Sequence, residues 1–320
     1  MSKFGVLVTG PAGAGKTTFC TALITHLHHS RRSAFYVNLD PAATDLSYTP
    51  DLDIRDLISL EDVMEEPLSL GPNGGLIYCF EFLLQNLDWL AEAIDPLTEE
   101  YLIIFDLPGQ IELYTHIPLL PELVKYLSRM GPLNISLCAA YLLEATFVVD
   151  KAKFFAGTLS AMSAMIMLEL PHVNILSKMD LVKDQVPKRE LRRFIDPDAN
   201  LLDQEDTGRD LLPSNASAGS GFVGPTGSGV VGAPEYTAMD VRNVHEVDSI
   251  MSGGSFKQLN RAVARLIDDF SMVSFLQLDV NDEESVGDVL SYIDDAIQFH
   301  EAQEPRDPKE PEPEDAPWED

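Results

Sequence analysis

A glycine-rich stretch from Gly10 to Thr18, GPAGAGKTT, constrains this chain more than any other segment, because it directly follows a short apolar run. The run Gly5–Thr9 predicts a buried strand, and residues 17–30 predict a helix that ends before Arg31 and Arg32. Glycines between a strand and a helix let backbone N–H groups turn towards one point at little steric cost, and the helix adds its positive end. The stretch therefore predicts an anion site at the end of the first strand.

The spacing of this stretch fits G-x-x-x-x-G-K-S/T, the pattern of phosphate-binding loops. In that pattern, Lys16 supplies a cation for the β- and γ-phosphates, and the Thr17 hydroxyl is the expected Mg²⁺ ligand. The alternative is a structural glycine turn, and the strand before and the helix after it favour the phosphate loop. The residues expected to hold the phosphates are Gly13, Ala14, Gly15, Lys16, Thr17 and Thr18.

Two further predicted strands end in acidic residues. Ser33–Leu39 is followed by Asp40, and Tyr101–Phe105 is followed by Asp106. The carboxyl ends of parallel strands are where open α/β sheets bind ligands. Given the phosphate loop, Asp106 is expected to hold Mg²⁺, usually through water, although a strand-end aspartate can also cap a helix. Taken alone, Asp40 is better explained as part of an Asp-Pro turn.

The residues after Asp106 add candidates for positioning a water molecule. Pro108 and Gly109 allow the backbone to approach a terminal phosphate closely. Gln110 and Glu112 follow and carry polar side chains that could orient an attacking water. Gln110 and Glu112 are therefore candidates for a catalytic role beside Asp106.

A fourth strand, Val173–Leu176, leads into Ser177-Lys178-Met179-Asp180, which resembles the guanine-reading N/T-K-x-D of GTPases. Guanine presents N1–H and an exocyclic amine, and the Asp180 carboxylate can accept from both, whereas adenine presents an acceptor at N1. The Lys178 stem can lie along the base. Ser177 stands where Asn is usual and has a shorter reach, so weaker guanine affinity is expected. A strand-end turn followed by a helix cap is the structural alternative.

Alternating strands and helices predict an α/β fold with a doubly wound, mostly parallel sheet. One or two surface helices are expected in Thr44–Glu66, and Gly71–Gly75, GPNGG, predicts a turn when taken alone. A Gly/Ser-rich insertion at about 200–254 and the acidic, Pro-rich tail 301–320 are predicted to be disordered. Further strands are expected at Ile135–Leu143 and Ser274–Leu278, and helices at Leu76–Ile94, Pro118–Met130, Lys151–Leu170, Pro187–Ile195, Ser255–Phe270 and Glu284–Phe299.

The net charge of −30 argues against a general binder of nucleic-acid backbones. Nine acidic and two basic residues in Glu301–Asp320 supply −7 of it, which leaves −23 for the rest. Three widely spaced cysteines predict reduced, structural thiols in a cytosolic or nuclear protein. No signal peptide is expected before the phosphate loop, and no apolar run reaches the roughly 20 residues of a membrane span.

The stretches GPAGAGKTT, NLDPA, GPNGG and DLPGQIE, followed by SKMD, together resemble the GPN-loop GTPases, P-loop GTPases related to the signal-recognition GTPases. The resemblance covers about Met1–Pro197 and Ser255–His300, and implies one GTPase domain over 1–300. It implies GTP/GDP and Mg²⁺ as cofactors, with Asp40 and Asp106 positioning the metal and the attacking water. Asn73 of the Gly71-Pro72-Asn73 loop would reach across a dimer interface to the γ-phosphate region in the partner's site.

The same resemblance implies the cellular role. The partner would be a GPN-loop paralogue or a second copy of the chain, and the clients would be RNA polymerase II subunits during assembly and nuclear import. Direct nucleic-acid and membrane partners are not expected, and the location would be the cytoplasm with nuclear shuttling. The main hypothesis is a Mg²⁺-dependent GTPase that acts as a dimeric switch. The alternatives are a phosphoryl-transfer kinase for a small or nucleic-acid acceptor, and a nucleotide-binding scaffold with little turnover.

Overall fold

The computed structural model describes residues 3–44, 46–65, 70–110, 118–182 and 273–303, together with Val186, Leu191 and Ile195. The chain divides into two compact units, Met1–Ile195 with Ser274–Asp320, and Asp196–Val273. All described residues except Val273 belong to the first unit. Most of the predicted helix Pro187–Ile195 lies outside the described residues, as do the predicted helix Ser255–Phe270, the insertion and residues 304–320 of the tail, so these remain predictions. Residues 301–303, predicted to be disordered, are helical.

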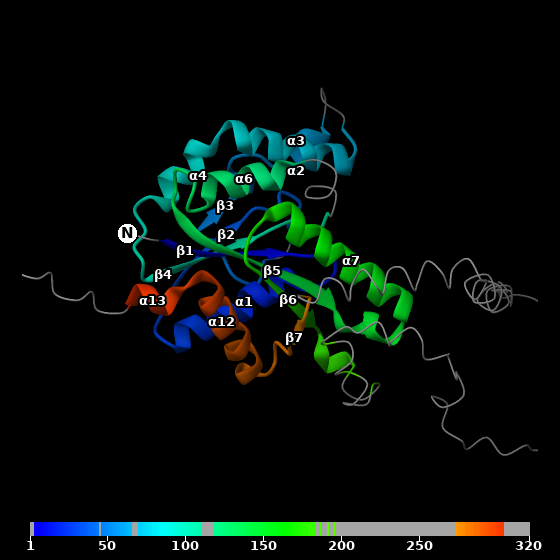
Figure 1. Ribbon diagram of the computed structural model, residues 1–320. Coiled ribbons are helices and arrows are strands. Elements are labelled where there is room, and N and C mark those ends of the chain that lie inside the picture. The colour runs from blue at the N-terminus through cyan, green and yellow to red at the C-terminus, as the bar shows by residue number, and fades with distance from the viewer. Residues whose placement is uncertain are drawn as a thin grey trace, which may run out of the picture. The chain divides into compact units, whose positions relative to one another are not determined.

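The described strands form one sheet of seven, in the order β3-β2-β4-β1-β5-β6-β7 (Figure 1). Every neighbouring pair is parallel, which confirms the predicted doubly wound α/β sheet. The longer strands are largely apolar because a parallel sheet is covered on both faces. Their bounds are β1 Lys3–Thr9, β2 Ser33–Asn38, β3 Leu52–Asp53, β4 Tyr101–Asp106, β5 Ile135–Glu144, β6 His172–Ser177 and β7 Phe275–Gln277.

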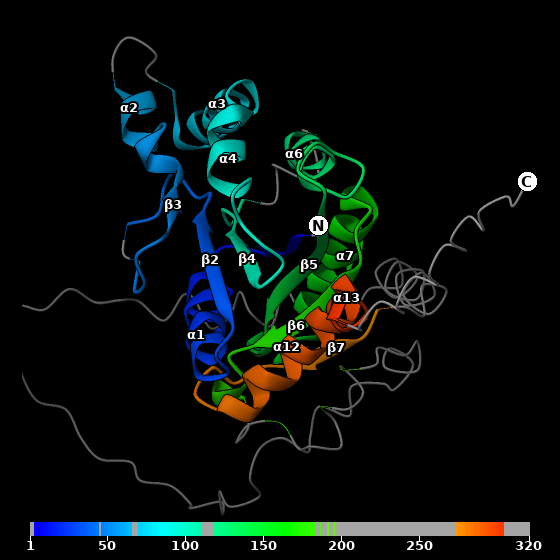
Figure 2. The ribbon, with the colours of Figure 1, turned by 90° about the vertical axis from the view of Figure 1, so that its left-hand side faces the viewer.

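Helices cover both faces of this sheet (Figures 1 and 2). On one face, α1 and α12 bury apolar side chains against alternate residues of β1 and β5 in a single core cluster. On the other face, α7 packs on β5 and contacts α6, which in turn contacts α3. The helix bounds are α1 Lys16–His29, α2 Leu60–Met64, α3 Pro72–Gln85, α4 Leu87–Ile94, α6 Leu119–Leu127, α7 Lys151–Leu168, α12 Glu283–Ile297 and α13 Phe299–Gln303.

The GPNGG segment is not the turn that its composition predicts. Gly71 is the N-cap of α3, Pro72 is its first residue, and the Gly75 N–H donates to the Gly71 carbonyl over 2.7 Å. Proline suits the first helical position because its φ is already helical and its missing N–H would be unpaired there in any case. Asn73 therefore lies in the first turn of a helix.

Two other segments also differ from the prediction. The helix expected over Leu76–Ile94 is divided at Asn86, which has φ −125° and ψ 40° and separates α3 from α4. Its side-chain amide donates to the Phe82 carbonyl over 2.7 Å, a local bond that competes with continued helix formation. The acidic stretch Thr44–Glu66 contains one short helix, α2, but also the strand β3 and a 3₁₀ turn at Ile54–Asp56.

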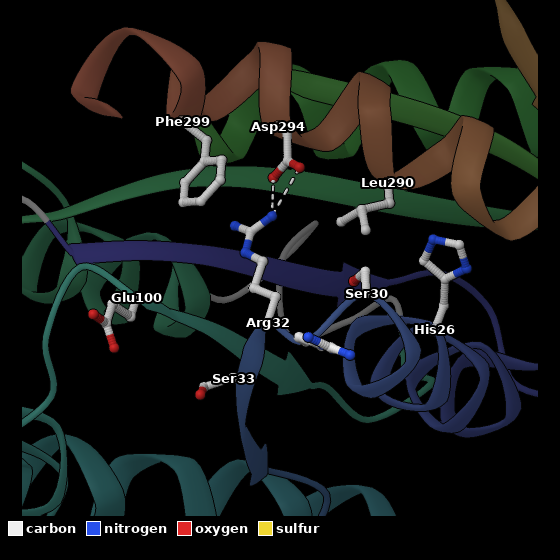
Figure 3. A pocket seen from close by; sticks show the side chains of 9 residues that line it. His26, Ser30, Arg32, Ser33, Glu100, Leu290, Asp294 and Phe299 are labelled. Atoms are coloured by element: carbon white, nitrogen blue, oxygen red, sulfur yellow. Dashed lines mark hydrogen bonds and ion pairs between the residues drawn. The ribbon is translucent and has the colours of Figure 1, made fainter. Parts of the chain in front are cut away.

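An arginine clamp ties the closing helices to the amino end of the sheet (Figure 3). Arg32, just before β2, donates from Nη1 to both oxygens of Asp294 on α12, at 2.7 and 2.8 Å. Its guanidinium carbon also lies 3.6 Å from the centre of the Phe299 ring. The clamp borders a cavity of about 610 Å³. It therefore links α1, β2, α12 and α13 at the end of the sheet away from the phosphate loop.

Two composition-based expectations can be compared with this fold. Cys20, Cys79 and Cys138 are all buried and free, as expected for structural thiols. None of the described helices is both long and apolar enough to cross a membrane.

A partly buried histidine, His172, opens β6. The His172 ring packs beside Tyr141, with ring centroids 6.0 Å apart. Both of its ring nitrogens are buried, and neither has a hydrogen-bond partner among the described residues. Because burial penalises the charged imidazolium, the pKa of His172 falls from 6.5 to about 4.

This histidine predicts a loss of stability in acid. Between pH 6.5 and about 4 the unfolded chain carries the proton and the folded chain does not, so the free energy of unfolding falls as the pH falls. Urea unfolding should show that His172 accounts for about 2 kcal/mol of the loss between about pH 7.5 and about pH 5. His172→Phe should lack this part of the loss. An equal loss in both proteins would contradict the prediction.

Candidate functional site

The predicted phosphate loop has the backbone that its glycines imply. Gly10, Gly13 and Gly15 have φ values of 133°, 80° and 86°, a region that other residues rarely adopt. Gly10 also lies against the Leu142 carbonyl of β5, where a side chain would clash with backbone. Gly15 is the N-cap of α1 and has no side chain that could occupy the helix N-terminus. The first-turn N–H groups and the helix dipole are thus available to an anion.

Lys16 provides the positive charge of this loop. Only 8% of Lys16 is exposed, and its Nζ donates to the Pro11 carbonyl over 3.3 Å within the same loop. Burial lowers the pKa of Lys16, while the nearby carboxylates of Asp106 and Asp40 oppose this shift. The ammonium group therefore lies in the electrostatic field of the two acids that were predicted to share its site.

Asp106, at the end of β4, occupies the centre of the site. Its Oδ2 accepts hydrogen bonds from the Thr17 hydroxyl at 2.7 Å and from the Tyr36 hydroxyl at 3.1 Å. Its Oδ1 is buried and has no partner among the described residues. Burial raises the pKa of Asp106, and the bonds from Thr17 and Tyr36 and the charge of Lys16 oppose that shift. Tyr36 was missed from the sequence because a tyrosine within an apolar strand predicts only core packing.

The oxygen atoms of Thr17 and Asp106 fit a magnesium ion. Mg²⁺ prefers hard oxygen donors and often takes only one or two protein ligands, with water and phosphate oxygens completing its shell. The unpartnered Oδ1 of Asp106 and the hydroxyl of Thr17 are donors of this kind. Within the described ranges there is no cluster of three or more His, Cys, Asp or Glu side chains suited to a metal. These two donors suit a metal ion that takes few protein ligands.

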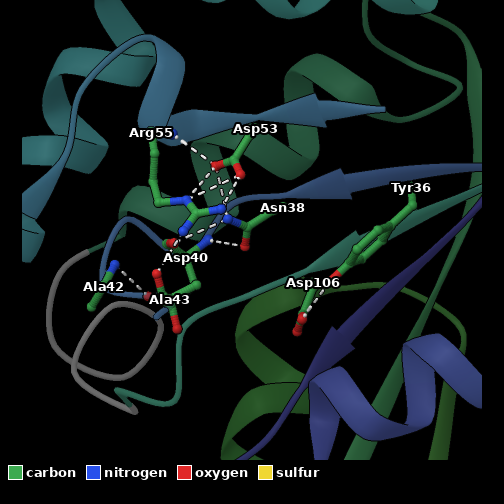
Figure 4. A network of polar contacts seen from close by, with 8 residues as sticks. All are labelled: Tyr36, Asn38, Asp40, Ala42, Ala43, Asp53, Arg55 and Asp106. Carbon is green, nitrogen blue, oxygen red and sulfur yellow. Dashed lines mark hydrogen bonds and ion pairs between the residues drawn. The ribbon is translucent and has the colours of Figure 1, made fainter. Parts of the chain in front are cut away.

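A polar network fixes the loop that carries Asp40 (Figure 4). The Asp40 carboxylate accepts the Ala42 N–H at 2.9 Å, the Asx turn expected of Asp-Pro, while the Asp40 N–H donates to Asn38 at 3.1 Å. Asn38 also donates to Asp53 on β3 at 2.9 Å. Burial raises the pKa of Asp40, and Lys16 is among the groups that oppose the shift. Asp40 thus has both a local turn role and a position in the electrostatic field of the phosphate loop.

Arg55 completes this network. Its Nε and Nη2 donate to the Asp53 carboxylate, and its Nη1 donates to the Ala43 carbonyl over 2.8 Å. Asn38 lies opposite Asp106 in the register of β2 and β4. The network therefore holds the Asp40 loop at the same sheet edge as Asp106. Sequence reasoning did not find Asn38, Asp53 or Arg55 because β3, which brings them together, is only two residues long.

The segment after Asp106 also reaches the phosphate loop. A side chain added at Gly109 would lie 2.7 Å from the Cα of Ala12, so only glycine fits this approach. Gln110 follows at a partly buried position. Glu112 lies outside the described residues, and the predicted water-orienting roles of both side chains remain predictions.

The guanine-reading motif follows β6 and is joined to the phosphate loop. The Ser177 hydroxyl donates to the Ala14 carbonyl over 2.6 Å and is also 3.3 Å from the Leu143 carbonyl. The single hydroxyl proton of Ser177 is thus donated to a backbone carbonyl. The predicted contact of Ser177 with a base stays a prediction. Met179 is buried, whereas Asp180 is exposed.

Lys178 lies beside the phosphate loop and is held by an acid. Its backbone has φ 58°, and its Cε lies 3.9 Å from the point where a Cβ on Gly15 would stand. Its Nζ lies 3.2 Å from Oε2 of Glu144 at the end of β5. The Thr146 hydroxyl, followed by Lys178, holds the pKa of Glu144 below its usual value. Sequence reasoning missed Glu144, since nothing in the sequence pairs the ends of β5 and β6.

Asn73 stands apart from this group of residues. It is exposed in the first turn of α3, and no hydrogen bond found in the described part of the chain connects it to the phosphate loop. The structure therefore brings together the phosphate loop, Asp106, the Asp40 loop, Ser177 and Lys178, and Gln110 and Asp180 follow directly after residues of this group. It does not add Asn73 to the same chain's site.

This chain is similar to known proteins over nearly its full length. A sequence profile described as "Conserved hypothetical ATP binding protein" matches residues 8–299. The protein named GPN-loop GTPase 3 from Aspergillus fumigatus is 68% identical over 310 residues, which cover 97% of this chain and 96% of the relative. The protein of the same name from Saccharomyces cerevisiae is 50% identical over 310 residues, covering 97% and 98%.

A solved structure shares the fold. The crystal structure of a GTPase in apo form from Pyrococcus abyssi aligns with a TM-score of 0.62, covering 92% of this chain and 97% of that one, at 19% identity. At that identity the likeness concerns the fold alone. This chain shares 50–68% identity over nearly its full length with proteins named GPN-loop GTPase 3, and it carries the phosphate loop and its neighbouring motifs. It therefore belongs to the GPN-loop GTPase family.

Proposed function

We propose that this GTPase is a Mg²⁺-dependent dimeric switch, in which GTP binding and hydrolysis change the contact between two subunits. The observation that carries the proposal is the group formed by Lys16 and Thr17 of the phosphate loop with Asp106 at the end of β4, whose Oδ1 is buried and has no partner among the described residues. When bound there, Mg²⁺ would neutralise charge on the phosphate oxygens. Thr17 and Asp106 would hold it, directly or through water.

The remaining residues of the site have distinct roles in this proposal. Backbone N–H groups of the glycine-rich loop and the ammonium of Lys16 cradle the phosphates and stabilise charge as it develops. Asp40 and Gln110 orient the attacking water. Asp180 accepts from the guanine base, and Lys178, held by Glu144, lies along the base face. Ser177 supports the loop from β6.

Asn73 is proposed to act in the site of a partner subunit. Its exposure at the start of α3 supports this role, because the side chain is free to reach a second molecule. The partner would be a second copy or a GPN-loop paralogue. An amide N–H placed near the γ-phosphate would donate to the charge that develops during transfer.

The cellular role is proposed from the family resemblance. The switch would serve assembly and nuclear import of RNA polymerase II, and the protein would be cytoplasmic and shuttle to the nucleus. Family membership supports this assignment.

Loss of Lys16 or Asp106 is expected to remove hydrolysis. Lys16→Ala and Asp106→Ala should each lower kcat by at least about 100-fold, because each removes a group that stabilises or positions the transferring phosphate. Single-turnover phosphate release from GTP measures this effect. Asp95→Asn, at an exposed acid, is the control and should turn over normally. Normal turnover in Asp106→Ala would refute the metal role.

Asn73→Ala is expected to separate hydrolysis from binding. GTP affinity should change by less than about twofold, whereas hydrolysis should slow by about tenfold or more, as for loss of a transition-state donor. In the wild type, the rate per subunit should rise with protein concentration, since the donor comes from a partner. Glu81→Ala, at an exposed residue of the same helix, is the control. Poor binding with a normal rate per bound GTP would exclude the proposed role.

The assembly role predicts nucleotide-dependent partners. Affinity purification of the chain from its own cells, with a non-hydrolysable GTP analogue and with GDP, should recover a GPN-loop paralogue and polymerase subunits in amounts that differ between the two nucleotides. Mass spectrometry identifies them. Recovery of the chain alone under both conditions would contradict the assembly role and favour a self-contained homodimeric enzyme.

A further inference from the structure

Tyr36 carries a hydroxyl that packing alone does not require. The residue lies in β2, is 1% exposed, and belongs to the core cluster beneath α1. A phenylalanine would fill the same space without bringing a polar atom into the core, and a buried hydroxyl is costly unless it has a partner. The partner here is Asp106, whose Oδ2 accepts from the hydroxyl over 3.1 Å. The oxygen of Tyr36 is therefore placed beside the Asp106 carboxylate, on the side of Oδ2.

The two hydroxyl donors leave the Asp106 carboxylate with one defined free oxygen. Thr17 on α1 and Tyr36 on β2 both donate to Oδ2, while Oδ1 is buried and has no partner among the described residues. A hydroxyl donates one hydrogen and keeps lone pairs, so Thr17 can donate to Asp106 and still offer oxygen to a metal. Tyr36 provides the second anchor that fixes the rotation of the carboxylate.

Tyr36 is itself held rigidly. Its N–H donates to the Asp51 carboxylate over 2.8 Å, and its carbonyl accepts the Asp51 N–H at 2.8 Å. In the register of β2 and β4 it lies opposite Ile104, two residues before Asp106. Its ring also packs edge-on against the ring of Tyr48, with ring centroids 6.3 Å apart. A donor fixed in this way can hold a metal-binding carboxylate in place before the metal arrives.

We propose that Tyr36 is a positioning residue for magnesium, which sets the Asp106 carboxylate so that Oδ1 faces the metal or its water. This inference rests on the proposed Mg²⁺-dependent hydrolysis of GTP. It assigns Tyr36 no contact with nucleotide or with the reacting atoms. Its effect should therefore be on metal affinity rather than on the chemical step.

The test compares Tyr36→Phe with the wild type and with Tyr48→Phe, which removes a neighbouring hydroxyl outside the site. The Mg²⁺ concentration that gives half-maximal hydrolysis should rise by about tenfold in Tyr36→Phe, for loss of a hydrogen bond to a charged group. The rate at saturating Mg²⁺ should stay within about twofold of the wild type, because the phosphate-binding groups are intact. Tyr48→Phe should change neither value.

A second readout does not depend on turnover. Electron paramagnetic resonance measures the affinity of the GDP complex for Mn²⁺, and this affinity should fall by a similar factor in Tyr36→Phe. The affinity for GDP in the presence of EDTA should not change. Equal Mn²⁺ affinity in the two proteins, or a lower maximal rate with unchanged metal dependence, would overturn the proposal. If Tyr36→Phe does not fold, Tyr36→Met, which also lacks the hydroxyl, takes its place.

The two proposals fail in different ways. A wild-type protein that hydrolyses no GTP in Mg²⁺ would refute the proposed function, and Mn²⁺ binding would still decide the role of Tyr36. A wild type that needs Mg²⁺, beside a Tyr36→Phe variant with the same Mg²⁺ requirement, would refute only the positioning role.

Discussion

The site depends on backbone contacts that are too close to admit side chains. Gly10 lies on the Leu142 carbonyl, and Gly109 lies on the Cα of Ala12. The Ser177 hydroxyl adds a short bond to the Ala14 carbonyl. These contacts join the ends of β4, β1, β5 and β6, which are neighbours in the sheet, to one loop. This convergence places Lys16, Thr17 and Asp106 at one point, whereas the Arg55 network holds the Asp40 loop beside them.

Three basic side chains lie among the acids of the site, in a chain whose net charge is −30. Lys16 is buried close to Asp106 and Asp40, and Lys178 is paired with Glu144. Arg55 likewise neutralises Asp53 beside the Asp40 loop. A polyphosphate can enter such a site because helix and loop N–H groups add positive potential that the formal charge does not count.

Much of this arrangement could be predicted from the sequence. Apolar runs followed by a glycine-rich loop or an acidic residue identified the strands. Because parallel strands bring their carboxyl ends together, these runs also predicted that Lys16 and Asp106 lie at the same edge of the sheet. Asn38, Asp53 and Arg55 could not be predicted, since they meet through a two-residue strand that has no periodicity to detect. The GPNGG segment was assigned to a turn because its composition outweighed the preference of Pro72 for the first position of a helix.

The start of α3 bears on how subunits of this kind could communicate. A side chain on a flexible loop must be ordered when it meets a partner, and that ordering opposes association. Asn73 belongs to a helical turn whose backbone is already fixed. Its amide can therefore be presented to another molecule at little entropic cost. By the same geometry, moving the backbone of Asn73 away from a partner would move the first turn of α3, so in the proposed dimer a small change at one nucleotide would be coupled to displacement of a helix.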